Sequence, residues 1–361
     1  LDVQMLQVTL PKDLPQDEQE EGIGESTRER IGVAEQFLST LSNLPTSWRD
    51  RILYGPPVVV FEIVARNDGV VVFYAGTERR YIDHLEKQIY AHYPEAQVDP
   101  ATDYTIFEEA DAIRTGSMRL ARKQHLPIGT YRELEADPMQ ALTGALAKIQ
   151  NKDAAVIQYV LQPASSKARR GGSRAAKQVT HGRQADVASS RSVVSGVEKI
   201  TKSQEDVQRK QQEAAQLTQR AQQRIELVEG KHAQQQFDVN IRIGVSCRQP
   251  EETERVFNAI VGAFSQYSIP DLNSLKVSSP KKPRGFLKDL IFRIPRHRSA
   301  NTFSTTEIAS LFHFPLPTTP TPNILWRGAK VTPAAADLPT EGIVLGTNVY
   351  RGVQTPVHFA R

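Results

Sequence analysis

This 361-residue chain offers mainly Lys and Arg side chains as candidate functional groups, and these are concentrated in two segments. Residues 163–196 hold seven Lys/Arg and one Asp, and residues 279–300 also hold seven Lys/Arg and one Asp. Such clusters neutralise nucleic-acid phosphates or attract an anionic membrane surface. The side chains predicted to make such contacts are Arg169, Arg170, Arg174, Lys177, Lys281, Lys282 and Arg284. Two plainer alternatives stay open: a tether for the first segment, and solvated loops beside a strand for the second.

Catalytic signatures are missing from the sequence. A phosphate-binding loop needs the pattern G-x-x-x-x-G-K-[ST], and the nearest match, around Gly230-Lys231, lacks the first glycine and the hydroxyl. The patterns G-x-G-x-x-G, H-E-x-x-H and G-x-S-x-G do not occur, and the eight histidines are scattered. We therefore expect no catalytic, cofactor or metal site and no enzyme activity. His313 is expected to pack or to form hydrogen bonds, and the single cysteine, Cys247, to be a buried, inert thiol.

The overall composition is ordinary for a globular protein, with 39% apolar residues, 24% charged residues and a net charge of +4. No stretch approaches the run of about 18 apolar residues that spans a membrane. A lone cysteine excludes an intrachain disulfide, which favours a reducing, cytoplasmic compartment. Because residue 1 is Leu rather than Met, we expect that the natural chain begins further upstream, with or without an anchor there.

The first 162 residues predict an α+β domain behind a short leader. Residues 1–25 indicate a strand and an acidic connector. Within residues 26–162, a helix precedes two β-branched runs that flank Asn67-Asp68-Gly69, a tight hairpin signal. From residue 70 to residue 162 the patterns follow the order β-α-β-β-α-β, which is that of a ferredoxin-like unit.

The remaining residues predict a connector and a second domain of the same kind. Residues 163–196 have no aromatic residue and no period, which predicts a disordered basic linker. Residues 197–236 predict a long polar helix. Residues 237–361 repeat the β-α-β-β-α-β order, with a strand at 285–294, a helix opened by a capping box, and a terminal hairpin. The predicted fold class is α+β: two ferredoxin-like domains joined by a disordered basic linker and a long helix.

The tail of the chain resembles a known family. The helix "STTEIASLFHFP" and the hairpin "LGTNVYRGVQTPV" are similar to the region just upstream of the nucleotide-binding strand in ATPases of type IV secretion and conjugative DNA transfer. The resemblance covers residues 237–361 well and residues 1–160 loosely. It implies that a RecA-like motor with a phosphate loop follows Arg361. It also implies a homo-oligomer, a hexamer, in the cytoplasm at the inner membrane face, contacting the secretion channel and handling DNA or protein.

Three interpretations follow. The first is a non-catalytic scaffold and docking region of a secretion or conjugation ATPase, which positions a C-terminal motor absent from this chain. The second is a stand-alone nucleic-acid-binding protein that uses the basic linker and the sheet surfaces. Against it, Phe73 and Tyr74 are adjacent and would point to opposite faces of a strand, which is unsuited to paired base stacking. The third is an enzyme with an unrecognised site.

Overall fold

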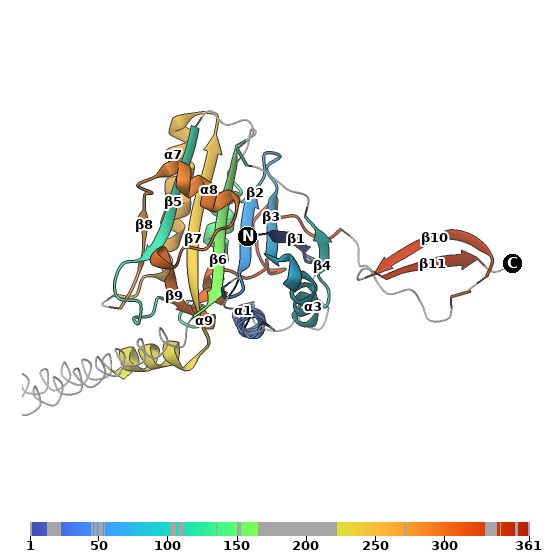
Figure 1. Ribbon diagram of the computed structural model, residues 1–361, viewed down its shortest axis with the longest axis horizontal. Coiled ribbons are helices and arrows are strands. Elements are labelled where there is room, and N and C mark those ends of the chain that lie inside the picture. The colour runs from blue at the N-terminus through green and yellow to red at the C-terminus, as the bar shows by residue number, and fades with distance from the viewer. Residues whose placement is uncertain are drawn as a thin grey trace, which may run out of the picture.

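A computed structural model describes residues 2–12, 23–44, 55–101, 112–134, 136–149, 153–164, 222–270, 272–328, 341–350 and 353–359, with a few isolated positions between them. The α+β class is confirmed. One sheet of nine strands carries helices on both faces, and a two-stranded hairpin forms a second sheet (Figure 1).

The large sheet is antiparallel at every pairing, in the order β4-β1-β3-β2-β6-β7-β5-β8, with β9 paired to β7. Its strands are β1 Val3–Thr9, β2 Val59–Ala65, β3 Val71–Glu78, β4 Gln97–Pro100, β5 Ala112–Leu120, β6 Ala154–Pro163, β7 Gln236–Cys247, β8 Leu275–Ser278 and β9 Asn301–Ser304. The hairpin consists of β10 Ile343–Tyr350 and β11 Val353–Phe359.

The described helices are α1 Ile23–Leu41, α3 Ile82–His92, α4 Met139–Leu146, α7 Pro250–Ala263, α8 Pro283–Ile291 and α9 Thr305–Leu311. Residues 222–233 are also helical and lead into β7. Residues 165–196 of the predicted disordered linker and residues 197–221 of the predicted long helix lie outside the described residues. At their outer ends both predictions are wrong, because Pro163 is the last residue of β6 and Gln236 is the first residue of β7.

The same connectivity occurs twice in the large sheet. The elements β1-α1-β2-β3-α3-β4 give the strand order β4-β1-β3-β2, and β5-α4-β6-β7-α7-β8 give β8-β5-β7-β6. Numbered within each half, both orders read 4-1-3-2. The two halves meet where β2 pairs with β6 along the whole of β2. Each half therefore has the β-α-β-β-α-β order expected from the sequence, but the halves share one sheet.

This single sheet does not match the predicted pair of separate domains at residues 26–162 and 237–361, nor a first β-α-β-β-α-β unit at residues 70–162. The strands between residues 70 and 162 divide between the two halves. Strands β3 and β4 pair with β1 in the first half, whereas β5 and β6 pair with β7 in the second. The segment between β6 and β7 does not separate two sheets, because these strands pair along the whole of β6. Local patterns locate strands but do not show which strands pair, so the error arose in the pairing.

The two faces of the sheet have different covers. Helices α1, α3, α4, α7 and α9 pack on one face around a continuous core, with Phe37, Leu85, Leu142, Phe257 and Leu311 among its members. Helix α8 packs on the other face, where Leu290 joins Val60, Val64 and Val156 in a second cluster. Figure 1 shows α8 in front of the strands and α7 behind them.

The predicted strand at residues 285–294 is wrong, because helix α8 occupies most of it. Pro283 stands at the start of the helix, where its missing N–H costs nothing. Leu287 and Leu290 are three residues apart and both pack on the sheet, which is a helical spacing. The apolar run looked like a strand because Ile291 and Phe292 extend it, but these two side chains are 47% and 55% exposed.

Candidate functional site

Helix α8 rests on a row of three polar residues at the centre of the sheet. Glu62 of β2 pairs with Gln158 of β6, and Gln158 pairs with Arg242 of β7. All three are at most 2% exposed. Because neighbouring paired residues point to the same face, the three side chains form one line beneath the helix.

The row satisfies the carbonyl groups at the end of α8. The Gln158 amide donates to Glu62 Oε1 and to the Leu290 carbonyl, both at 2.8 Å. Arg242 Nη1 donates to the Asp289 carbonyl at 2.7 Å and to Gln158 Oε1 at 2.9 Å. Burial lowers the pKa of Arg242 to about 10, although the Asp289 charge opposes the shift. The last carbonyls of a helix lack partners within the helix, so these donors fix its C-terminal end.

Two further arginines hold the chain after α8. Arg293 has a left-handed backbone with φ 55°, and its guanidinium donates to both oxygens of Glu62 at 2.9 and 3.2 Å. Arg296 Nε donates to Asp289 Oδ2 at 2.7 Å. Both carboxylates near α8 are thereby engaged by cations of its own segment, and the segment is held rigidly against the sheet.

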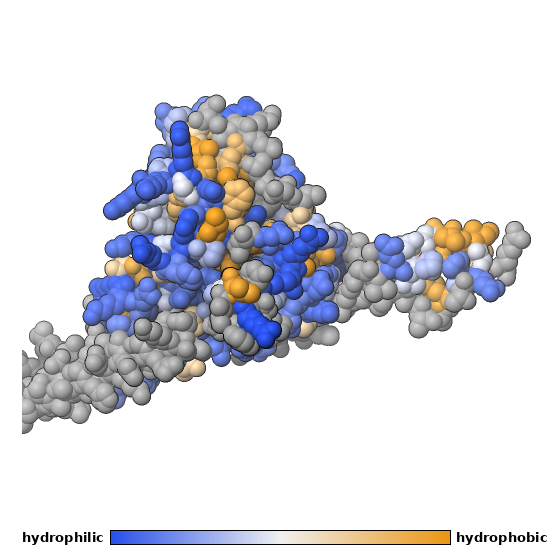
Figure 2. All heavy atoms as spheres, viewed as in Figure 1, coloured by the Kyte–Doolittle hydropathy of each residue, from blue (hydrophilic) through white to orange (hydrophobic). Residues whose placement is uncertain are grey.

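The outer side of α8 carries cations and apolar residues together. The predicted contact residues Lys281, Lys282 and Arg284 are exposed there, as is Lys288. Ile291 and Phe292 are also exposed, and Figure 2 shows apolar atoms beside hydrophilic ones over this part of the face. Of the predicted contact residues, the structure brings together these three. Arg169, Arg170, Arg174 and Lys177 lie outside the described residues.

The hairpin β10–β11 is a second exposed surface. Its strands pair with each other from Ile343–Phe359 to Tyr350–Val353, with an irregularity between Val344 and Gly346. Among the described strands, neither pairs with any other. Four apolar side chains on it are more than half exposed: Ile343 at 55%, Val344 at 61%, Leu345 at 66% and Phe359 at 58%. Figure 2 shows these apolar atoms open on the hairpin.

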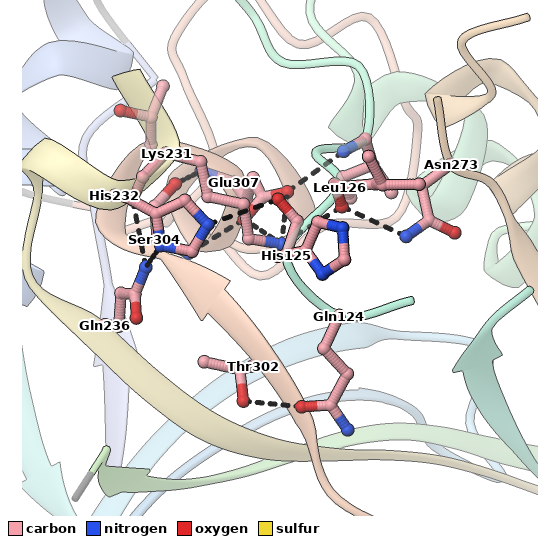
Figure 3. A network of polar contacts seen from close by, with 12 residues as sticks. Gln124, His125, Leu126, Lys231, His232, Gln236, Asn273, Thr302, Ser304 and Glu307 are labelled. Carbon is pink, nitrogen blue, oxygen red and sulfur yellow. Dashed lines mark hydrogen bonds and ion pairs between the residues drawn. The ribbon is translucent and has the colours of Figure 1, made fainter. Parts of the chain in front are cut away.

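A buried ion pair fixes the helical residues 222–233 to the body (Figure 3). Lys231 Nζ lies 3.1 Å from Glu307 Oε2, and each side chain is 1% exposed. Lys231 also donates to the Leu126 carbonyl at 3.3 Å. Glu307 is the third residue of α9 and completes a capping box with Ser304. Its Oε1 also accepts from the Ile128 N–H at 2.9 Å. Burial lowers the pKa of Lys231, and the facing Glu307 limits the shift.

A neutral histidine completes this junction. The Gln236 amide lies 3.1 Å from both His232 Nδ1 and the Lys231 carbonyl, so its NH₂ group donates to both. His232 Nε2 lies 3.3 Å from the His125 carbonyl and must carry the proton. Burial lowers the pKa of His232, which agrees with this neutral form. Figure 3 shows the junction joining residues from the 222–233 helix, β7, α9 and the loop after β5.

The other reactive side chains have structural surroundings. His313 Nε2 lies 3.1 Å from Asp137 Oδ1, and both side chains are 1% exposed. His313 Nδ1 also lies 2.9 Å from the Ala309 carbonyl, to which it donates. Burial would raise the pKa of Asp137, but the His313 charge and the hydrogen bonds lower it. Cys247 is buried, and burial raises the pKa of its thiol to about 11. Both side chains lie in surroundings of the kind that the sequence predicts.

No group of His, Cys, Asp or Glu within the described residues could hold a metal ion. A shallow hollow on α3, lined by Asp83, Glu86, Lys87, Tyr90 and Ala91, contains no nucleophile–base pair. None of the described helices is both long and apolar enough to cross a lipid bilayer. The two exposed surfaces are therefore the better candidates for function.

The polar row under α8 was not anticipated from the sequence. Its signal is a single charged or amide residue inside an otherwise apolar strand, as in "VVFEIVA", "AAVIQYV" and "NIRIGV". Buried polar side chains need partners. Three such strands could therefore have suggested a shared network.

The described residues form a doubled α+β sheet with two exposed surfaces, the outer side of α8 and the hairpin β10–β11. The chain belongs to the family described as Domain of unknown function (DUF8128), whose model matches residues 25–327. The matched region contains both halves of the sheet except β1, and it ends before the hairpin. No curated protein matches the chain.

Proposed function

We propose that this chain is the non-catalytic scaffold and docking region of a secretion or conjugation ATPase. In this proposal each half of the sheet is a ferredoxin-like unit, and the doubled sheet is a rigid base. The hairpin β10–β11 docks on a RecA-like motor that is not part of the chain. By the resemblance of the tail, the assembled protein is a hexamer in the cytoplasm, at the inner membrane face, beside a secretion channel.

The observation that carries the proposal is the exposed hairpin. An isolated two-stranded sheet is marginally stable in water. This hairpin leaves four large apolar side chains open, and neither of its strands pairs with another described strand. A partner sheet that adds a strand to one edge and covers one face would supply both missing interactions.

The nucleic-acid interpretation has weaker support. Ferredoxin-like RNA platforms stack bases on an open sheet face. Here one face carries five of the described helices, and the other is buried under α8 at its centre, where Glu62, Val64 and Val156 are at most 4% exposed. Among the residues that the structure describes, only the exposed cations around α8 favour this alternative, and they could bind phosphates without a sheet surface.

The first test is the coding sequence after the codon for Arg361. A G-x-x-x-x-G-K-[ST] motif within about 10–20 residues is expected. Absence of this motif would contradict the proposal that a nucleotide-binding motor is encoded there. We also expect that the 361-residue chain, without that region, neither binds nor hydrolyses ATP. Turnover that co-purifies with the chain through stringent cleanup would contradict this.

The second test uses the motor region as a separate protein. The double variant Ile343→Ser/Phe359→Ser removes two apolar side chains that face each other on the hairpin. Both are about half exposed in the chain, so docking can bury about half of each. At 1.5–3 kcal/mol for a fully buried side chain, the loss is about 2 kcal/mol, or about 30-fold in Kd. The matched control is Ile113→Ser/Val277→Ser, which changes two exposed apolar residues of the body and should bind as the parent does. Equal binding by both variants would refute hairpin docking.

A further inference from the structure

We propose that the α8 surface binds an anionic lipid surface, with its cations on the headgroups and with Ile291 and Phe292 among the upper acyl chains. The α8 surface is here defined by Lys276, Lys281, Lys282, Arg284, Lys288, Ile291, Phe292 and Arg298. The inference goes beyond hairpin docking and does not depend on it.

The first support is the charge of the segment. Residues 276–298 contain eight Lys/Arg and one Asp. Arg293 is engaged with Glu62, and Arg296 with Asp289. This leaves six exposed cations on the segment: on β8, around the start of α8, in its last turn and after its end. Each Lys or Arg close to an anionic bilayer adds a comparable favourable electrostatic free energy to membrane binding. Six such residues on one segment therefore form a peripheral binding site for anionic lipid.

The second support is the arrangement of α8 itself. At 100° per residue, Arg284, Lys288 and Ile291 lie within about 60° of one another on the outer side of the helix. Phe292 follows at the point where the helix ends. Leu290 points the other way and is 3% exposed on the sheet. The outer stripe therefore combines cations with two bulky apolar side chains, and it contains no acidic residue.

The apolar side chains favour lipid over nucleic acid. Single-stranded nucleic acids bind to several aromatic rings that stack on successive bases. The α8 surface offers one ring, Phe292, beside an aliphatic Ile291 that has no use on a base or phosphate. Exposed bulky apolar side chains among Lys and Arg are instead typical of segments that lie in a membrane interface.

The polar row under α8 makes this surface rigid before it binds. The end of α8 is fixed by Gln158 and Arg242, and the following turn by Arg293 on Glu62. Binding then requires little further ordering of the backbone, which reduces its entropic cost.

The experiment is vesicle co-sedimentation of the full 361-residue chain. Vesicles of phosphatidylcholine with phosphatidylglycerol are compared with pure phosphatidylcholine. We expect binding only to the anionic vesicles and weaker binding at higher salt. The variant Lys282→Gln/Arg284→Gln/Lys288→Gln should lower the partition coefficient on the order of 100-fold. The matched control, Lys87→Gln/Lys148→Gln/Arg255→Gln, removes three exposed cations outside the α8 surface and should bind as the parent does.

A second variant tests insertion. Phe292→Trp should show a blue-shifted emission and quenching by brominated acyl chains that the parent, with its two native tryptophans, does not show. Thermal melts of each variant serve as the check that the substitution leaves the fold intact. Three results would overturn the proposal: no binding to anionic vesicles, equal loss in the test and control variants, or no brominated-lipid quenching. Binding of an oligonucleotide in place of vesicles, with the same loss in the test variant, would assign the surface to nucleic acid and also overturn it.

Discussion

Removing the Lys231 ammonium is expected to be one of the most destabilising single changes in the chain. In Lys231→Met, Glu307 stays buried at 1% exposure with no cation facing it. It keeps the Ile128 and Ser304 N–H groups at 2.9 and 2.8 Å, which compensate part of the lost charge interaction. Breaking a buried ion pair by removing one partner typically costs about 3–5 kcal/mol. With these two donors retained, we expect a loss of about 3 kcal/mol.

The double variant Lys231→Met/Glu307→Gln should recover much of this loss. A glutamine at position 307 is neutral, and its carbonyl oxygen can accept from one of the two N–H groups. The expected residual cost is about 1–2 kcal/mol for the unsatisfied donor and the lost Leu126 contact. The single variant Glu307→Gln, which leaves Lys231 buried and unpaired, should cost about 3 kcal/mol.

Urea unfolding of the parent and the three variants measures these differences as a double-mutant cycle. The pair should show a coupling energy of at least about 2 kcal/mol. Purely additive single effects would refute the claim that the two charges depend on each other. So would a Lys231→Met chain that unfolds at the same urea concentration as the parent.

Three other expectations follow from the same contacts. The pKa of Asp137 in the folded chain lies below its ordinary value of 3.8, because its pairing with His313 and its hydrogen bonds favour the carboxylate. The stabilisation from this carboxylate is therefore complete above pH 3.8 and is lost as the pH falls through the pKa of the folded state. Asp137→Asn should therefore lower the free energy of unfolding at neutral pH by about 3 kcal/mol. It should also lack the parent's loss of stability at acid pH, measured by urea melts from pH 7 to pH 2.5. The same acid-dependent loss in the variant would contradict this. Arg242→Met removes the side-chain donor of the Asp289 carbonyl, which then keeps only the Ile294 N–H at 3.0 Å, so hydrogen exchange should quicken in α8 but not in α7. Equal exchange rates of α8 in the parent and the variant would refute the anchoring role. Trypsin should cut residues 163–196 first, and the two pieces should co-elute in size exclusion because β6 and β7 pair along the whole of β6; separation of the pieces would disprove the shared sheet.

The sequence predicted the kinds of element better than their partners. The tight turn at Asn67-Asp68-Gly69 lies between β2 and β3, and Gly69 has φ 80°. The capping box on α9 and the proline start of α7 are also as the sequence predicts. These features depend on residues close together in the chain, so local chemistry determines them.

The shared sheet and the polar row could not be predicted in the same way. The pairing of β2 with β6 joins residues about 100 positions apart, and Arg293 contacts Glu62 across 231 positions. Apolar strands such as β6 are compatible with several neighbours, and only the complete fold selects one. Helix α8 was mistaken for a strand because its two exposed apolar residues hid the helical spacing of the buried ones. The exposure that misled the prediction is the same feature that makes α8 a candidate surface.

Hydrogen exchange of the hairpin tests the central claim most directly. Backbone amides of residues 343–350 and 353–359 are measured in the 361-residue chain and in a longer chain that continues through the region encoded after Arg361. If the hairpin docks on a motor, these amides should exchange rapidly in the shorter chain and be strongly protected in the longer one, while amides of β6 and β7 stay protected in both. Equal, rapid exchange of the hairpin in both chains would contradict the proposal that it is a docking element.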